Sequence, residues 1–148
     1  MLEIAISDEQ MQLKSDHARL QLAAERVLAD AGVSDGELSI ALVDDAVIQD
    51  LNRRYLDHDG PTDVLSFLLE RDGQRLEGEV VVSAETAARS AQGFGWSADD
   101  ELLLYVIHGV LHLVGFDDQD PQSLAEMRDR EAYYLRQFGL EPRDHPEP

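Results

Sequence analysis

The stretch HGVLHLVGFDD, residues 108–118, lies at the end of an apolar segment and is the most informative part of the sequence for the fold. Its two histidines, His108 and His112, are four residues apart, so a helix would place both imidazoles on one face, where they can chelate one metal ion. Gly115 then allows the chain to turn back, and a carboxylate shortly after it can supply a third ligand. This stretch predicts a metal site on a helix.

The residues before and between the histidines predict a helix from Ala98 to Val114 that is apolar on nearly every side. Ser97 and Asp100 have the spacing of a capping box at its start. A helix with this composition is expected to be buried, and buried imidazoles need partners. We therefore expect the metal site to lie on a buried central helix.

The pattern of apolar residues predicts about four strands and four to five helices. Strands are expected near residues 2–7, 38–43, 64–68 and 78–83. Helices are expected near residues 16–31, after Asp44 or Asp45, from 83 or 84 to 91, and over 98–114 and 121–138. Helices separate some of the strands, whereas two others can form a hairpin. This order predicts an α+β fold with a mixed sheet, not a doubly wound parallel sheet.

The length of 148 residues, without a long linker, predicts one domain over residues 1–140 and a disordered tail over 141–148. The absence of cysteine excludes disulfides, thiolate zinc sites and cysteine nucleophiles, and is compatible with a reducing cytoplasm. No basic-then-apolar leader and no run of about 20 apolar residues is present. We expect a cytoplasmic protein without a membrane role.

The charge balance is strongly acidic: 31 acidic residues against 12 basic ones give a formal net charge of −19. A field of this sign opposes docking to phosphate backbones, so no DNA partner is expected, and an RNA partner would require a local positive patch. The same acidic surface would suit a basic protein partner.

Gly109 lies inside the predicted metal helix, where glycine costs about 1 kcal/mol relative to alanine. We expect a close approach of backbone or substrate to compensate for this cost. In zinc peptidases of related spacing, this position holds the glutamate that acts as general base. Glycine cannot take that role, so a metallopeptidase is the disfavoured alternative.

Three segments resemble the signatures of the YbeY family, which are bacterial metal-dependent endoribonucleases associated with rRNA processing and ribosome quality control. HGVLHLVGFDD is similar to the family signature HGxLHLxGYDH. Residues 51–55 and 61–67 together resemble LNxxYRxxDxPTDVLSFP, and GEVVVS at 78–83 resembles the strand GDIVIS. The three segments follow one another in the family's order, from Leu51 to Asp118.

The resemblance implies that His108, His112 and Asp118 bind one divalent metal ion. The family has histidine at the position of Asp118. Aspartate is also a competent ligand, but its negative charge makes the site less positive. Zinc remains the favoured ion, and Mn, Fe or Ni become alternatives.

The resemblance also implies that Thr62, Asp63 and Ser66 shape the substrate cleft. Leu56 occupies the position of a family arginine that is thought to assist RNA cleavage, and Arg54 is a candidate replacement because a guanidinium can pair with phosphate oxygens. We assign no side-chain general base, and metal-activated water is the expected nucleophile.

The function implied is a metal-dependent, single-strand-specific endoribonuclease that acts in rRNA maturation, at the 3′ end of the small-subunit rRNA, and in ribosome quality control. Its partners would be rRNA and a small-subunit ribosomal protein. The alternative is a ribosome-assembly binding factor that has the metal site but weak or no nuclease activity. Leu56, Asp118 and the net charge motivate this alternative.

Overall fold

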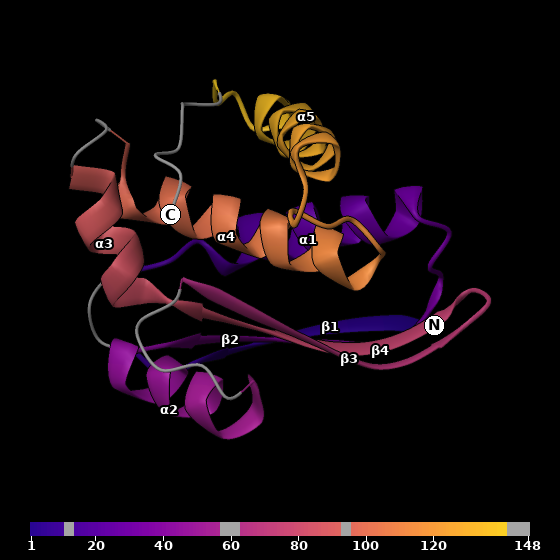
Figure 1. Ribbon diagram of the computed structural model, residues 1–148, viewed down its shortest axis with the longest axis horizontal. Coiled ribbons are helices and arrows are strands. Elements are labelled where there is room, and N and C mark those ends of the chain that lie inside the picture. The colour runs from indigo at the N-terminus through magenta and orange to yellow at the C-terminus, as the bar shows by residue number, and fades with distance from the viewer. Residues whose placement is uncertain (11–13, 57–62, 93–95, 142–148) are drawn as a thin grey trace.

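The computed structural model describes residues 1–10, 14–56, 63–92 and 96–141 (Figure 1). The elements follow the order β1 (Leu2–Asp8), α1 (His17–Asp30), β2 (Asp35–Val43), α2 (Asp45–Leu56), β3 (Val64–Asp72), β4 (Arg75–Ser83), α3 (Ala84–Gln92), α4 (Ala98–Leu113) and α5 (Pro121–Gln137). The strands form one sheet in the order β1-β2-β4-β3. β1, β2 and β4 are parallel, and β3 is antiparallel to β4. The predicted α+β fold with a mixed sheet is confirmed.

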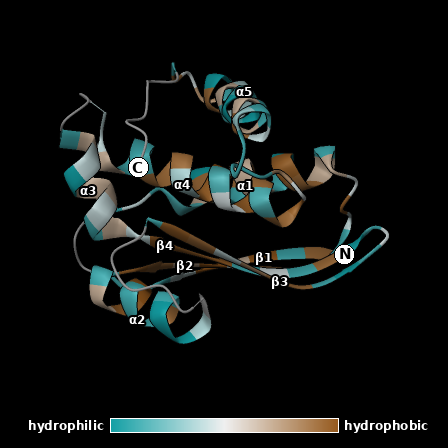
Figure 2. Ribbon diagram, viewed as in Figure 1, coloured by the Kyte–Doolittle hydropathy of each residue, from teal (hydrophilic) through white to brown (hydrophobic). Residues whose placement is uncertain are grey.

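Helices cover both faces of the sheet (Figure 1). α1, α4 and α5 lie on one side and α2 on the other, and apolar residues line the space between the layers (Figure 2). α4 contacts β3 and β4 as well as α1, α3 and α5. It is therefore the central helix of the main core, whereas a smaller apolar cluster packs around Ile48 of α2.

Local sequence signals account for the helix starts. Asp16 caps α1, and Asp120 caps α5 immediately before Pro121. Ser97 and Asp100 form the predicted capping box of α4, in which each side chain accepts a hydrogen bond from the backbone N–H of the other residue. These caps set the first turn of each helix, so the phase of α4 is established well before the histidine pair.

The hairpin of β3 and β4 is longer than the apolar pattern predicts. Pairing continues to Asp72 and Arg75, beyond the predicted strand ends at residues 68 and 78, with a bulge between Leu68 and Glu70. The extra residues of β3 are exposed and largely polar, so they lack the alternation that marks a half-buried strand. Within this extension Leu76 of β4 is buried in the core, and the other side chains are exposed or half-buried, so strand pairing holds most of this part of the hairpin.

α4 is buried along almost its whole length: eleven of its 16 residues are buried.

Within the ranges that the structure describes, no helix is long and apolar enough to span a membrane.

Candidate metal centre

α4 carries His108 and His112 one turn apart, with their ring centroids 4.7 Å from each other. Their side chains are only 16% and 30% exposed, because the rest of α4 is packed into the core. The backbone of a buried helix is rigid, so the two imidazoles are held in a fixed relative position.

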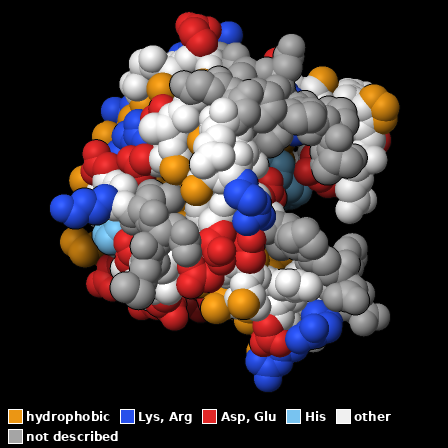
Figure 3. Space-filling view, turned by 90° about the vertical axis from the view of Figure 1, so that its left-hand side faces the viewer, with side chains coloured by type: hydrophobic (Ala, Val, Ile, Leu, Met, Phe, Trp, Pro, Cys, Tyr) orange, Lys and Arg blue, Asp and Glu red, His pale blue; other side chains and the backbone are white. Residues whose placement is uncertain are grey.

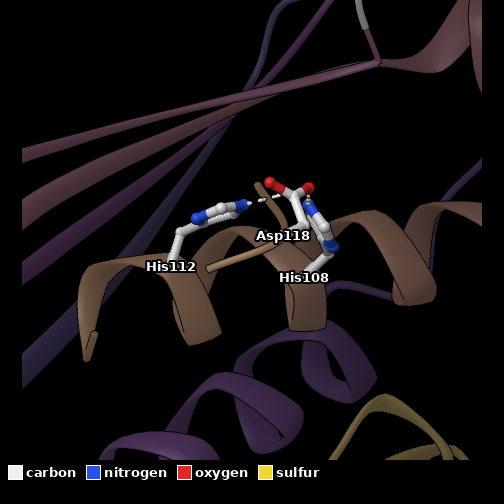
Figure 4. Close-up of side chains that lie close together, drawn as sticks. All are labelled: His108, His112 and Asp118. Carbon is white, nitrogen blue, oxygen red and sulfur yellow. Dashed lines mark ion pairs between the residues drawn. The ribbon is translucent and has the colours of Figure 1, made fainter. Parts of the chain in front are cut away.

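The turn after α4 brings a carboxylate to the histidine pair. Gly115 has a φ of 109°, a left-handed conformation that few other residues adopt, and its N–H donates to the carbonyl of His112 at 3.1 Å. Phe116 N–H then donates to the carbonyl of Leu111 at 3.0 Å. The reversed chain places Asp118 over the two rings (Figure 4).

The three side chains converge on one point. Asp118 Oδ2 lies 3.6 Å from Nε2 of His108 and 3.6 Å from Nε2 of His112, and the three donor atoms all lie within 4.8 Å of one another. Two ligand atoms about 2.1 Å from a tetrahedral zinc ion are about 3.4 Å apart. The set therefore fits one divalent cation, and a mixture of imidazole and carboxylate donors suits several metals of this class.

The surroundings of His112 favour its neutral form. Burial lowers the pKa of His112, and the neighbouring His108 lowers it further, whereas Asp118 and Asp117 act in the opposite direction. The net shift is downward, so the imidazole stays neutral to a lower pH than a free histidine. Neutral imidazole is the form that binds metal. Asp117 also accepts a hydrogen bond from the backbone N–H of Asp118 at 2.7 Å, which fixes the turn at the ligand.

Glu131 of α5 is a buried carboxylate that the sequence analysis missed. Its Oε2 lies 2.6 Å from His108 Nδ1, and Arg128 donates to its Oε1 at 2.8 Å. Burial raises the pKa of Glu131, but the contacts with His108 and Arg128 outweigh this effect and hold it below its ordinary value. One signal could have revealed it: Glu131 lies four residues after Met127 and four before Leu135, on the otherwise apolar stripe of α5.

Gly109 explains how closely α4 approaches the sheet. A Cβ at this position would lie 2.6 Å from Val80 Cγ1 and 3.0 Å from Val64 Cγ2. The Ser66 hydroxyl donates to the Gly109 carbonyl at 2.8 Å. The expected close backbone approach is thus present, and the glutamate of a zinc peptidase would not fit here without displacing the sheet.

A pocket of about 420 Å³ opens over the histidine pair. Its size lies within the range of ligand pockets in proteins. In Figure 3, a histidine side chain is visible in a hollow of the surface with acidic side chains beside it. The residues that line the pocket are Asp63, Val64, Leu65, Ser66, Leu68, His108, His112, Leu113 and Asp118.

Two of the three residues expected in the substrate cleft, Asp63 and Ser66, border this pocket, and Thr62 lies outside the described residues. Arg54 is 63% exposed on α2 and forms an ion pair with Asp50 at 3.4 Å, and it is not one of the pocket-lining residues. Leu56 is the last residue of α2. Residues 57–62, which connect α2 to the pocket wall, are outside the described part of the chain.

Fold and site define a class: an α+β protein in which a buried helix and the turn after it present a His-His-Asp set able to hold a divalent metal ion. Within this class, the chain belongs to the endoribonuclease YbeY family, whose model matches residues 3–139.

Relatives named endoribonuclease YbeY include one from Rhodopirellula baltica, 44% identical over 128 residues, and one from Salinibacter ruber, 38% identical over 140 residues. The first alignment covers 84% of this chain and 66% of the relative, and the second covers 89% of each. The solution structure of TM1509 from Thermotoga maritima has a TM-score of 0.61 to this chain at 28% identity, over 92% of this chain and 87% of TM1509.

Proposed function

We propose that this protein is a metal-dependent endoribonuclease that hydrolyses phosphodiester bonds in single-stranded RNA. The observation that carries the proposal is the convergence of His108, His112 and Asp118 at a pocket, in a chain of the endoribonuclease YbeY family. We propose zinc as the ion, with Mn, Fe or Ni as alternatives because one of the three ligands is a carboxylate.

The residues that line the pocket have different proposed roles. When bound, a divalent ion would polarise a phosphoryl oxygen and lower the pKa of a coordinated water. Leu68 and Leu113 contribute apolar side chains to the pocket lining. Ser66 donates its hydroxyl proton to the Gly109 carbonyl, so it holds the helix against the wall of the cleft and does not offer that proton to the substrate. No side chain of the described residues is assigned as general base.

RNA binding by this acidic protein requires local cations. Arg53 and Arg54 are 59% and 63% exposed at the end of α2, where both form ion pairs with Asp50. An exposed ion pair is weak and exchanges readily for a phosphate partner. We propose Arg54 as a phosphate contact outside the pocket, and Thr62, Asp63 and Ser66 as residues that shape the cleft.

The biological role proposed is rRNA maturation, at the 3′ end of the small-subunit rRNA, together with ribosome quality control in the cytoplasm. A small-subunit ribosomal protein is the proposed protein partner. The resemblance of three sequence segments to the family signatures supports this role, and the net charge of −19 favours a basic partner.

The net charge and Asp118 also favour a second candidate function, a ribosome-assembly binding factor with a metal site and weak or no nuclease activity. Both features reduce the positive potential that an RNA backbone would meet at the site. Unimpaired binding of a basic ribosomal protein by a metal-free His108→Ala/His112→Ala variant, with no cleavage by the wild type, would support this candidate over the nuclease.

A cleavage assay on a labelled single-stranded RNA tests the nuclease proposal. We expect cleavage by the wild type, loss of cleavage after treatment with a chelator, and recovery when a divalent metal is added. His112→Ala should be inactive. His17→Ala is the matched control, because His17 pairs with Asp8 outside the site and is 44% exposed. Equal cleavage by His112→Ala and wild type, from preparations free of contaminating nuclease, would reject the proposal.

A further inference from the structure

The two ring nitrogens of His108 each face a different carboxylate, on opposite edges of the imidazole. Nε2 faces Asp118 Oδ2 at 3.6 Å, on the side of the converging donor atoms, and Nδ1 faces Glu131 Oε2 at 2.6 Å. Glu131 belongs to α5, a different helix from the one that carries the histidines. The two contacts leave the ring little freedom to rotate or flip.

We infer that Glu131 is a positioning residue of the metal centre: it accepts a hydrogen bond from His108 Nδ1–H and so keeps the Nε2 lone pair directed at the metal. This inference rests on the proposed function, because it assigns a task to Glu131 within the same site. A neutral imidazole carries one proton, and a carboxylate at Nδ1 determines which nitrogen holds it. Such carboxylate–histidine pairs behind metal sites orient the ring and increase the basicity of the ligand.

Arg128 holds the carboxylate in place. It lies one turn before Glu131 on α5 and donates to Oε1, which leaves Oε2 for His108. The Glu131 side chain is 4% exposed, whereas that of Arg128 is 35% exposed. A carboxylate this deeply buried and bonded at both oxygens has a single orientation, so it can impose one on His108.

Fold stability alone is a weak explanation for this pair. Replacing a buried ion pair by apolar residues is often neutral or stabilising. The neighbours of Glu131 on the same stripe of α5, Met127 and Leu135, are apolar and buried, so a leucine at position 131 would continue the stripe. The contact with His108 is what a leucine could not supply.

Zinc affinity provides the first test, measured by competition with a chromophoric chelator at neutral pH. Glu131→Leu should bind zinc about 10- to 100-fold more weakly than wild type. Glu131→Gln should lose less, because its amide oxygen can still accept from Nδ1–H. Asp8→Asn is the matched control: it removes the carboxylate from a histidine–carboxylate pair outside the site, in which Asp8 Oδ2 lies 2.9 Å from His17 Nε2. Its zinc affinity should equal that of wild type.

Nitrogen NMR of the metal-free protein provides a second readout that a purely structural role would not change. We expect His108 to carry its proton on Nδ1 in the wild type and in Glu131→Gln, and to shift toward the Nε2–H tautomer in Glu131→Leu. Wild-type zinc affinity in a folded Glu131→Leu variant would overturn the inference, as would an Nε2–H tautomer of His108 in the wild type. If Glu131→Leu does not fold, the wild-type tautomer decides. If wild type binds no zinc, the proposed function fails, whereas the tautomer still tests this inference.

Discussion

Gly109→Ala perturbs the contact between α4 and the sheet, and its effect can be worked out from distances. The new Cβ would lie 2.6 Å from Val80 Cγ1, 3.0 Å from Val64 Cγ2 and 3.2 Å from Ser66 Oγ. In an exposed helix this substitution would stabilise by about 1 kcal/mol. Overpacking costs about 1–3 kcal/mol. Loss of the hydrogen bond from Ser66 to the Gly109 carbonyl costs about 1 kcal/mol more. The free energy of unfolding should therefore fall by about 1–3 kcal/mol.

Urea unfolding followed by circular dichroism measures this change, and the midpoint of thermal unfolding should fall by about 2–4 °C per kcal/mol. Val80→Ala provides the sharper comparison, because it removes the Cγ1 atom nearest to the new methyl group. In a Val80→Ala background, Gly109→Ala should cost less than it does alone, which a double-mutant cycle detects. The packing argument would be refuted if Gly109→Ala alone were as stable as the wild type, or if its cost were the same in both backgrounds.

Three further predictions concern charge. Burial raises the pKa of Asp45, but bonds from two hydroxyls and Arg89 hold it below its ordinary value of 3.8. The stabilisation by ionised Asp45 is therefore complete above pH 3.8 and is lost as the pH falls below that value. In Asp45→Asn, the free energy of unfolding should fall less steeply with decreasing pH in this acid range than it does in the wild type. An unchanged slope would contradict this. Arg54→Ala should raise the KM for RNA and leave kcat near the wild-type value. A fall in kcat as large as the rise in KM would contradict a role limited to phosphate binding. Asp118→His should raise the ratio of zinc to manganese affinity in competition titrations, and an unchanged ratio would count against Asp118 as a ligand.

Local signals were sufficient to predict the part of the fold that carries the site. The capping box of Ser97 and Asp100, and the spacing of His108 and His112, depend on positions within one helix, so the sequence encodes them directly. The chain reversal at Gly115 was predictable for the same reason. The end of the hairpin was not, because strand pairing carries it through residues of β3 that are exposed, with Leu76 of β4 as its one buried side chain.

Glu131 marks the limit of sequence reasoning about the site. It lies 23 residues after His108 in the chain, and only the packing of α5 on α4 brings the two together. A glutamate on an amphipathic helix is normally solvated, and the sequence analysis did not single out Glu131. Its place on an apolar stripe was the one available signal. The reason for Gly109 likewise became clear only when Val80 and Val64 were in place.

The central claim is that His108, His112 and Asp118 hold one divalent metal ion. Elemental analysis of purified wild type, His112→Ala and Asp118→Ala, each dialysed against the same metal-containing buffer and then desalted, tests it most directly. The account predicts about one equivalent of a divalent transition metal per chain in the wild type and a large loss in both variants. A metal-free wild type, or variants that retain the same stoichiometry as the wild type, would contradict it.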